Sequence, residues 1–320
     1  MKRFLASATW ATALFATGLS NAQSATKLDG RWDLTITIAG DHYPSWMEVK
    51  TGGATPEVRV VSRVASVHPA KNVRLVGNAL TFQSSEYFGK TVDVDWEVKL
   101  SGDKLVGVQK RSDAVTGRIA GSRAPALDAP VPKEWNAPEP IFNGRDLTGW
   151  EKLYTEPGKD PESHWEVENR ELINRKPGAN IRTKRTFQDF KLHVEFNCPQ
   201  DGNSGVYLRG RYEVQVEYEP KGTNDESHGM GAIYGFLAPA RKLPPRPGQW
   251  ETIDITLVGR RVTVVRNGET TIDNQEIPGI TGGAIDSREG EPGPIYIQGD
   301  HTAGMRYRNI QISTPKRGAS

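Results

Sequence analysis

The sequence predicts an all-β protein made of two antiparallel β modules, the second of them a jelly-roll-like sandwich. Apolar and β-branched residues alternate with polar residues over many short segments, which is the pattern of half-buried strands. Turn dipeptides separate these segments, and Asn267-Gly268 is a strong two-residue hairpin signal. Long segments with the 3.6-residue period of an amphipathic helix are absent from the sequence.

Residues 1–22 are predicted to be a signal peptide. The start MKR is positively charged, FLASATWATALFATGLS is weakly apolar, and Ser20-Asn21-Ala22 places small residues around a cleavage point after Ala22. A buried N-terminal helix is the alternative, and the polar segment NAQSATKLDG that follows argues against it. No cysteine lies near the cleavage point, so we expect a periplasmic or secreted protein without lipid attachment there.

The first module is predicted to span residues 26–124 and to form a small β-barrel or β-sandwich. Its predicted strands cover residues 32–38, 46–51, 57–63, 72–83, 92–109 and 117–123. Trp32, Trp46 and Trp96 could stack on sugar rings, but each lies within a strand pattern, which favours a place in the core.

The five prolines between Ala124 and Pro140 stiffen the chain and remove amide donors, which predicts a linker over residues 125–138. The second module then covers residues 139–316. Its predicted strands lie at residues 190–198, 205–211, 212–219, 250–259, 260–273, 293–300 and 305–313. Strands of similar length between Gly and Pro loops predict two packed antiparallel sheets.

Composition excludes several classes of function. The 41 Lys and Arg residues nearly balance the 39 Asp and Glu residues, and a formal net charge of +2 gives no nucleic-acid footprint. No apolar run approaches the roughly 20 residues that span a bilayer, so membrane insertion is not expected. Cys198 is the only cysteine, which excludes an intramolecular disulfide and a multi-cysteine zinc site. Oligomeric state has no signal in the sequence.

One hairpin, NSGVYLRGRYEVQVEYEP at residues 203–220, separates two kinds of side chain. Because side chains alternate along a strand, one face carries Val206, Leu208, Val214 and Val216. The other face carries Tyr207, Arg209, Glu213, Gln215, Glu217 and Glu219. This polar row lies either in water, as in most one-sided sheets, or in a binding cleft, and alternation alone leaves both open.

The sequence lacks the motifs of esterases, nucleotide-binding loops and zinc proteases. A glycosidase needs two carboxyl groups about 5 to 5.5 Å apart for retention or about 6.5 to 9.5 Å apart for inversion. Residues four apart on a strand are separated by roughly 13 Å, so Glu213 and Glu217 are too far apart. Only Glu217 with Glu219, roughly 6.6 Å apart, could serve an inverting reaction.

Six segments of the second module form an ordered set. They are FNGRDLTGWE (142–151), NSGVYLRGRYEVQVE (203–217), GAIYGF (231–236), PGQWETIDI (247–255), VRNGE (265–269) and GPIYIQGDHTAGMRYRNIQI (293–312). In this order they resemble the 3-keto-disaccharide hydrolase family. The resemblance implies a concanavalin A-like lectin and glucanase sandwich. It also implies a small carbohydrate substrate, a glycoside whose ring carries a ketone at C3.

A C3 ketone changes the chemistry that the protein must supply. The ketone acidifies the hydrogen on C2, so a base can remove it, form an enolate and expel the C1 substituent, after which water adds to the double bond. This route needs a base, a group that holds the enolate oxygen, and an acid near the leaving oxygen. It does not need a carboxylate pair at glycosidase spacing.

The resemblance also implies candidate site residues, matched position by position. These are Asn203, Ser204, Arg209, Glu213, Gln215, Tyr234, Gln298, His301 and Arg308. Glu217 is a tenth candidate, at about the position where the family commonly has Asp. Arg308 has a structural alternative, a pair with a carboxylate.

Roles follow from the chemistry of these side chains. His301 is the first choice for the general base, because imidazole titrates near neutral pH, and Glu217 is the second. Arg209 would hold the enolate or a sugar oxygen, and Glu213 with Gln215 would hold hydroxyl groups. No ligand spacing requires a cofactor, although a divalent cation at Glu217, His301 or both is a further alternative.

We therefore expect an exported enzyme that cleaves 3-keto glycosides or disaccharides. A non-catalytic carbohydrate-binding protein is the alternative, because sandwiches of this kind commonly bind sugars without chemistry. A purely structural exported protein is the third hypothesis.

Overall fold

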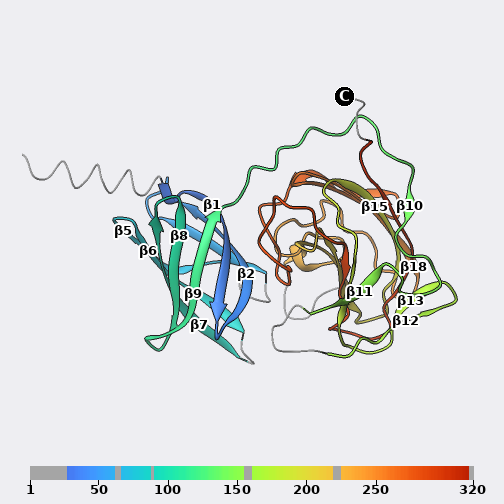
Figure 1. Cartoon of the computed structure of the whole chain (residues 1–320), viewed down its shortest axis with the longest axis horizontal. Coiled ribbons are helices and arrows are strands. Elements are labelled where there is room, and N and C mark those ends of the chain that lie inside the picture. Colours follow the sequence, from blue (N-terminus) through green and yellow to red (C-terminus); the bar gives the residue numbers. More distant parts are fainter. Residues whose placement is uncertain (1–26, 62–65, 88–89, 155–160, 219–224, 317–320) are drawn as a thin grey trace, which may run out of the picture.

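The structure, a computed structural model, describes residues 27–61, 66–87, 90–154, 161–218 and 225–316 (Figure 1). The predicted signal peptide, residues 1–22, lies outside them, so export stays a prediction. Strands dominate the described residues and pair antiparallel throughout, which confirms the all-β prediction. Helix in this part of the chain is limited to short turns such as η1 (Glu226–His228), and none has the length and apolar character needed to cross a membrane.

The first module is a nine-stranded antiparallel sheet in the order β4-β3-β2-β1-β9-β8-β7-β6-β5 (Figure 1). Its strands are β1 (Gly30–Ile38), β2 (Asp41–Lys50), β3 (Glu57–Val61), β4 (Val67–Pro69), β5 (Lys71–Val76), β6 (Ala79–Tyr87), β7 (Thr91–Ser101), β8 (Lys104–Arg111) and β9 (Ala114–Arg123). Because β1 pairs with both β2 and β9, the two ends of the module are neighbours, and the strands enclose their own apolar core.

The three tryptophans of the first module are buried, which confirms their assignment to the core. Trp32 is 1 % exposed, and Trp46 and Trp96 are 0 % exposed. Trp96 stacks on Phe82 inside the first module, with ring centroids 5.2 Å apart. Trp46, on β2, instead belongs to the apolar core of the second module. None of the three therefore presents a ring to a sugar.

The predicted linker, residues 125–138, contains no strand. Its prolines account for this, because proline donates no amide hydrogen to a ladder. The chain then enters β10 (Glu139–Pro140), which pairs with the last strand of the second module. Arg260 Nη2 donates a hydrogen bond to the carbonyl of Pro125, so the start of this stretch is tied to the second module.

The second module is a sandwich of two antiparallel sheets. The larger follows the order β12-β13-β22-β15-β18-β19-β20, with β10 beside β22, and the smaller follows β11-β14-β21-β16-β17. The bounds are β11 (Trp150–Leu153), β12 (Trp165–Glu168), β13 (Glu171–Asn174), β14 (Asn180–Thr183), β15 (Phe190–Asn197), β16 (Asn203–Leu208), β17 (Tyr212–Glu217), β18 (Trp250–Val258), β19 (Arg261–Arg266), β20 (Glu269–Glu276), β21 (Tyr296–Ile297) and β22 (Arg306–Ser313).

The core of the second module lies between the inner faces of its two sheets. Val206, Val214 and Val216 line the smaller sheet, and Phe196 and Ile255 line the larger, each no more than 2 % exposed. Alternation in β16 and β17 turns these valines inward because burial of apolar area is the dominant favourable contribution to folding. The prediction of a concanavalin-like jelly-roll sandwich is confirmed.

The two modules are in direct contact. Trp46 and Phe236 meet edge to face across the boundary, with ring centroids 5.3 Å apart. Asp33 and Glu289 form a buried carboxyl pair at the same boundary. Burial first, and then the charge of Glu289, raises the pKa of Asp33 to about 9, against the opposing effect of nearby arginines. The pair therefore holds a proton at neutral pH.

The inward valines generate the first prediction. Val214→Ala and Val216→Ala each remove buried methyl groups from the sandwich core and should lower the free energy of unfolding by about 1 to 3 kcal/mol. Val115, on β9, is 54 % exposed, and Val115→Ala should change the free energy of unfolding by less than about 0.5 kcal/mol. Urea unfolding of the three variants measures this. Equal losses at all three positions would contradict the burial of β17 in the core.

Candidate functional site

The smaller sheet carries a polar face on the side away from the core. Register places Asn203 opposite Glu217, Gly205 opposite Gln215, and Tyr207 opposite Glu213 across β16 and β17. Tyr296 of β21 lies beside Tyr207, and their rings stack with centroids 3.8 Å apart. We define the polar face as the side chains of Asn203, Tyr207, Glu213, Gln215, Glu217, Tyr296 and Gln298.

This face is covered rather than wet. Glu213 and Gln215 are each only 3 % exposed, and Gln298 is 9 % exposed. The alternative in which the polar row is simply solvated is therefore wrong at its centre. Desolvating carboxyl and amide groups costs free energy, so a buried polar row needs internal partners or a ligand. Glu219, the end of the predicted row, lies outside the described residues.

Gly205, which lies opposite Gln215 in the register, leaves room for the Glu213 side chain. A Cβ atom at Gly205 would lie 2.2 Å from Glu213 Oε1, so the carboxyl group occupies the space that any other residue would fill. The Tyr207 hydroxyl is 2.8 Å from Glu213 Oε2 and 2.9 Å from the carbonyl oxygen of Gly282. The Tyr207 hydroxyl donates its one hydrogen toward these two acceptors, so the proton of a neutral Glu213 is not used by Tyr207.

Burial is also the main electrostatic influence on this carboxyl group. It raises the pKa of Glu213 from 4.5 to about 8, while Tyr207 and the charge of His301 act in the opposite direction. Glu213 is therefore largely neutral at pH 7 and carries a proton that it can donate. A neutral carboxyl group on a polar face resembles the protonated acids that enzymes use as hydrogen-bond donors.

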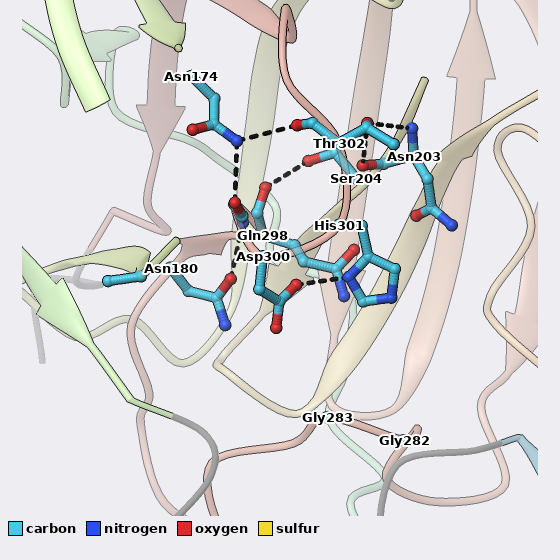
Figure 2. Close-up of polar contacts among 12 residues, drawn as sticks. Asn174, Asn180, Asn203, Ser204, Gly282, Gly283, Gln298, Asp300, His301 and Thr302 are labelled. Atoms are coloured by element: carbon cyan, nitrogen blue, oxygen red, sulfur yellow. Dashed lines mark hydrogen bonds and ion pairs between the residues drawn. The ribbon is translucent and has the colours of Figure 1, made fainter. Parts of the chain in front are cut away.

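The segment Gln298–Thr302, which we call the His301 segment, follows β21 and crosses the end of the polar face. Asn180 Oδ1 accepts a hydrogen bond from the backbone N–H of Gly299 at 2.7 Å, and Asn174 Nδ2 donates to the carbonyl of Thr302 at 3.1 Å (Figure 2). The Thr302 hydroxyl bonds both backbone groups of Asn203. These bonds fix the loop although it has no regular strand.

His301 faces a carboxylate within its own segment. Its Nδ1 is 2.5 Å from Asp300 Oδ1, and the two side chains point toward each other in Figure 2. This hydrogen bond is the largest influence on the ring, and the charges of Asp300, Glu213 and Glu217 add to it, so the pKa of His301 is raised despite partial burial. An Asp–His pair of this kind fixes the ring orientation and leaves Nε2 for proton transfer.

Two amide oxygens on the polar face lack hydrogen-bond partners among the described residues. They are Gln215 Oε1 and Gln298 Oε1. Gln215 also donates to Glu217 Oε2 at 3.0 Å through Nε2, so its amide orientation is fixed. Buried acceptors without partners are uncommon in folded proteins, and hydroxyl groups of a sugar would satisfy them.

Tyr234 is brought to the same place by a different element. The segment Gly231–Leu237, which we call the Tyr234 segment, pairs with β17 through Tyr234 N–H to the Glu213 carbonyl at 3.1 Å. Burial and the charges of Glu213 and Glu217 raise the pKa of Tyr234 to about 12. Its hydroxyl therefore stays protonated at neutral pH and can donate to a ligand.

Arg209 is not brought to the polar face, which corrects the sequence-based assignment. Period-two alternation places Arg209 on the same face as Tyr207, but β16 ends at Leu208 and Arg209 has a left-handed φ of 53°. Its guanidinium is 0 % exposed and donates to the Gly259 carbonyl at 2.7 Å and to the Tyr212 hydroxyl at 3.2 Å. It lies at the end of the sandwich core and is not placed to hold a sugar oxygen.

Ser204 and Arg308 are also placed elsewhere. The Ser204 hydroxyl is fully buried on the core face, where it donates to the Gln298 carbonyl and accepts from Tyr307. Arg308 lies on the larger sheet, pairs with Glu195 at 2.6 Å and stacks over a tryptophan ring. Both are structural contacts, and for Arg308 this is the carboxylate pair that the sequence left open.

Sequence reasoning missed two members of the site. Asp300 precedes His301 directly in the segment that carried the family resemblance, and a carboxylate beside a candidate base is a readable signal. Tyr207 alternates in phase with Glu213 across the hairpin, but its role depends on the Gly282 carbonyl, which arrives from a distant loop. Only the folded chain shows that contact.

The geometry of a metal site is a separate matter. Among the residues described, no group of three or more His, Cys, Asp and Glu side chains is arranged to hold a metal ion. Glu217 and His301 act on each other electrostatically, so a cation shared between them stays a prediction from the sequence.

Cys198 is buried, and burial followed by nearby carboxylate charge raises the pKa of its thiol to about 12, which makes it a poor nucleophile at neutral pH.

A β-sandwich with a neutral acid, an Asp–His pair and unpartnered amide acceptors beside one sheet has the polar groups of a site for a small hydroxylated ligand. Comparison with known families makes this specific. The chain belongs to the family of 3-keto-alpha-glucoside-1,2-lyase-like domains, whose profile matches residues 137–313. The family therefore covers nearly all of the second module and none of the first.

Several solved structures are similar to this chain. A Parabacteroides distasonis protein assigned to the glycosyl hydrolases is 27 % identical with a TM-score of 0.46, over 58 % of this chain and 93 % of that one. A second from the same organism is 23 % identical with a TM-score of 0.43, over 56 % of this chain and 100 % of that one. A non-specific endo-beta-1,3(4)-glucanase is 12 % identical with a TM-score of 0.36, over 59 % and 94 %. No curated protein matches the chain.

The buried acid generates the second prediction. Because the pKa of Glu213 rises from 4.5 to about 8 on folding, the native state keeps a proton that the unfolded state releases in this window. The stabilisation is complete below about pH 4.5 and is lost as pH rises to about 8. The glutamine in Glu213→Gln cannot titrate. Between pH 5 and pH 8 the free energy of unfolding of this variant should therefore increase by about 2 to 4 kcal/mol relative to that of the wild type.

Urea unfolding at several pH values measures this difference. Glu57→Gln is the matched control, because Glu57 is exposed on β3 and its replacement should leave the wild-type pH profile unchanged. Parallel profiles for wild type and Glu213→Gln would show that Glu213 is ionised in the folded protein at neutral pH.

Proposed function

We propose that this protein is an exported enzyme that cleaves 3-keto glycosides by C2 deprotonation, elimination of the C1 substituent and hydration. The observation that carries the proposal is an Asp–His pair and a neutral carboxyl group within electrostatic reach of each other. Family membership supports a carbohydrate substrate, and the family description supports the 3-keto form. Export rests on the N-terminal sequence pattern.

The reaction divides into three balanced steps. A base removes the proton from C2, and the electron pair of that bond becomes the enolate of the C3 ketone. The enolate collapses to an unsaturated ketone as the C1–O bond breaks, and the departing alkoxide takes a proton to become the free aglycone. Water then adds its hydroxyl to C1 and a proton to C2, which gives the 3-keto sugar.

His301 is the base in this proposal. Its neutral Nε2 takes the C2 proton while Asp300, on Nδ1, stabilises the imidazolium that forms. Glu213 donates its proton as a hydrogen bond to the C3 oxygen, whose negative charge grows as the enolate forms. Gln215 and Gln298 accept hydrogen bonds from ring hydroxyl groups through their unpartnered oxygens. Tyr234 is a further donor at the edge of the face.

Proton NMR in heavy water tests the reaction directly. Incubation of the protein with a 3-keto disaccharide such as 3-keto-trehalose should release a product that carries deuterium at C2, because that proton exchanges with solvent during elimination and hydration. A protein-free sample measures uncatalysed exchange. Product with a protonated C2 would indicate direct hydrolysis, and saturable binding without any product would identify a carbohydrate-binding protein instead.

The third prediction concerns the pH dependence of turnover. Only neutral His301 can act as the base and only neutral Glu213 can donate to the C3 oxygen, so kcat/KM should rise with pH as His301 loses its proton and fall above about pH 8 as Glu213 ionises. The hydrogen bond to Asp300 is the main reason that the pKa of His301 is raised, so the midpoint of the rising limb should lie above the ordinary value of about 6.5. Asp300→Asn removes the main cause, and its midpoint should move down toward that value. An unchanged midpoint in Asp300→Asn would show that another group controls the profile.

The fourth prediction separates the two candidate bases. His301→Ala should lose about a hundred- to ten-thousandfold in turnover together with C2 exchange, the usual contribution of a positioned base. Glu217→Gln should mainly raise KM, because Glu217 bonds the Gln215 amide that orients substrate. If C2 exchange survives in His301→Ala and disappears in Glu217→Gln, the base is Glu217. Loss in both variants, with chelation inactivating the parent protein and a divalent ion restoring it, would assign a cation to these two residues.

A further inference from the structure

The polar face is bordered by a segment of the second module that lies against the first module. The Tyr234 segment (Gly231–Leu237) extends the smaller sheet beyond β17 through three backbone hydrogen bonds. These run from Gly231 N–H to the Gln215 carbonyl at 2.8 Å, from Gln215 N–H to the Ala232 carbonyl at 2.9 Å, and from Tyr234 N–H to the Glu213 carbonyl at 3.1 Å. The segment thus continues the sheet only briefly before it turns away at Gly235.

The backbone of this segment has little intrinsic preference for its shape. Gly231 and Gly235 both have positive φ, at 80° and 74°, and glycine is the residue with the largest loss of conformational freedom on ordering. Such a turn holds one geometry when its surroundings constrain it. The constraint on the outer side comes from the first module.

Three residues of the first module cover the turn. Ser66 lies so close to Gly235 that a Cβ atom on the glycine would be 2.6 Å from the serine Cβ. Trp46 meets Phe236 edge to face at 5.3 Å, and Val67 packs on the apolar cluster that includes Ile233. Trp46 is also in contact with Gly279, where an added Cβ would lie 2.1 Å from its Nε1. The indole is therefore enclosed by the second module.

A second connection runs through two histidines toward Tyr234. Burial and the nearby His228 lower the pKa of His68, which places these residues of different modules near each other. The His228 ring in turn meets Tyr234 edge to face, with centroids 4.8 Å apart. The first module therefore contacts the Tyr234 segment directly and lies near the His228 ring that meets Tyr234.

We propose that the first module is a working part of the substrate site, in which Trp46 is a positioning residue that holds the Tyr234 segment against β17. We call the contact between Trp46 and the Tyr234 segment the clamp. Its expected effect on catalysis rests on the proposed function, whereas the clamp itself is a statement about the fold. When the clamp is weakened, Tyr234 should lose its fixed place beside Glu213, and substrate should bind less tightly. The chemistry at His301, which is anchored separately, should change much less.

The test uses the full chain with two disruptive variants and two controls. Trp46→Leu removes the ring that meets Phe236, and Phe236→Ala removes the partner from the half-buried side, where folding is less at risk. Trp96→Leu is the matched control, because Trp96 is equally buried in the first module but stacks on Phe82, away from the second. Trp46→Phe should keep most of the function, since it retains an aromatic ring that can meet Phe236 and removes an indole N–H that has no described partner.

Hydrogen exchange reads the clamp without any substrate. The Gly231 and Tyr234 amide hydrogens should exchange at least about tenfold faster in Trp46→Leu and Phe236→Ala than in wild type and Trp96→Leu. With the 3-keto disaccharide, KM should rise about five- to fiftyfold in the two disruptive variants, a typical size for coupling between sites, while kcat falls less than about threefold. Trp46→Phe should resemble the wild type in both measurements.

Unchanged exchange of the two amides in both disruptive variants would overturn the clamp. Faster exchange with unchanged KM would overturn its role in the substrate site, as would an equal rise in KM for Trp96→Leu. If the wild type neither binds nor converts the 3-keto disaccharide, the proposed function fails on its own account, and the exchange comparison still decides whether the first module holds the Tyr234 segment.

Discussion

The contact between the inner face of β16 and β17 and the larger sheet constrains the rest of the second module. Val206, Val214 and Val216 must face inward to bury apolar area, and a slip of one residue would turn every one of them outward. Because side chains alternate along a strand, the same constraint also fixes which side chains lie on the opposite face. Hydrophobic burial therefore sets the position of Glu213, although that residue contributes nothing to the core.

The pKa values of Glu213 and His301 are both raised, but for different physical reasons. Glu213 keeps its proton because it is desolvated, whereas the pKa of His301 is raised chiefly because its ring is hydrogen-bonded to the Asp300 carboxylate. Burial acts on an acid in the direction that keeps it neutral, and carboxylates act on an imidazole in the direction that keeps it charged. One small region thus contains a proton donor, Glu213, and a potential proton acceptor, His301, which are the two kinds of group that acid–base catalysis needs.

The fold class, the facing of the valines and the location of His301 near Glu213 could be anticipated from period-two alternation and family resemblance. The failures have identifiable causes. Arg209 was misplaced because a strand pattern does not reveal that β16 ends one residue earlier in a left-handed turn. Ser204 is a candidate only through the family resemblance, whereas alternation places it on the same face as Val206, where it accepts a hydrogen bond from the Tyr307 hydroxyl. The depth of Glu213 depends on loops distant in sequence, which local patterns do not encode.

Gly205 shows how an absent side chain can restrict what a site becomes. The Glu213 carboxyl group occupies the space beside Gly205. A methyl group on Gly205 would lie closer to Glu213 Oε1 than van der Waals contact allows. Efforts to change substrate preference by diversifying the strand floor would meet this steric limit at once. Gly235 and Gly299 set similar limits in the Tyr234 and His301 segments, where an added Cβ would lie 2.6 Å from Ser66 Cβ and 2.5 Å from Trp165 Nε1. New specificity would therefore have to come from positions that already carry a side chain.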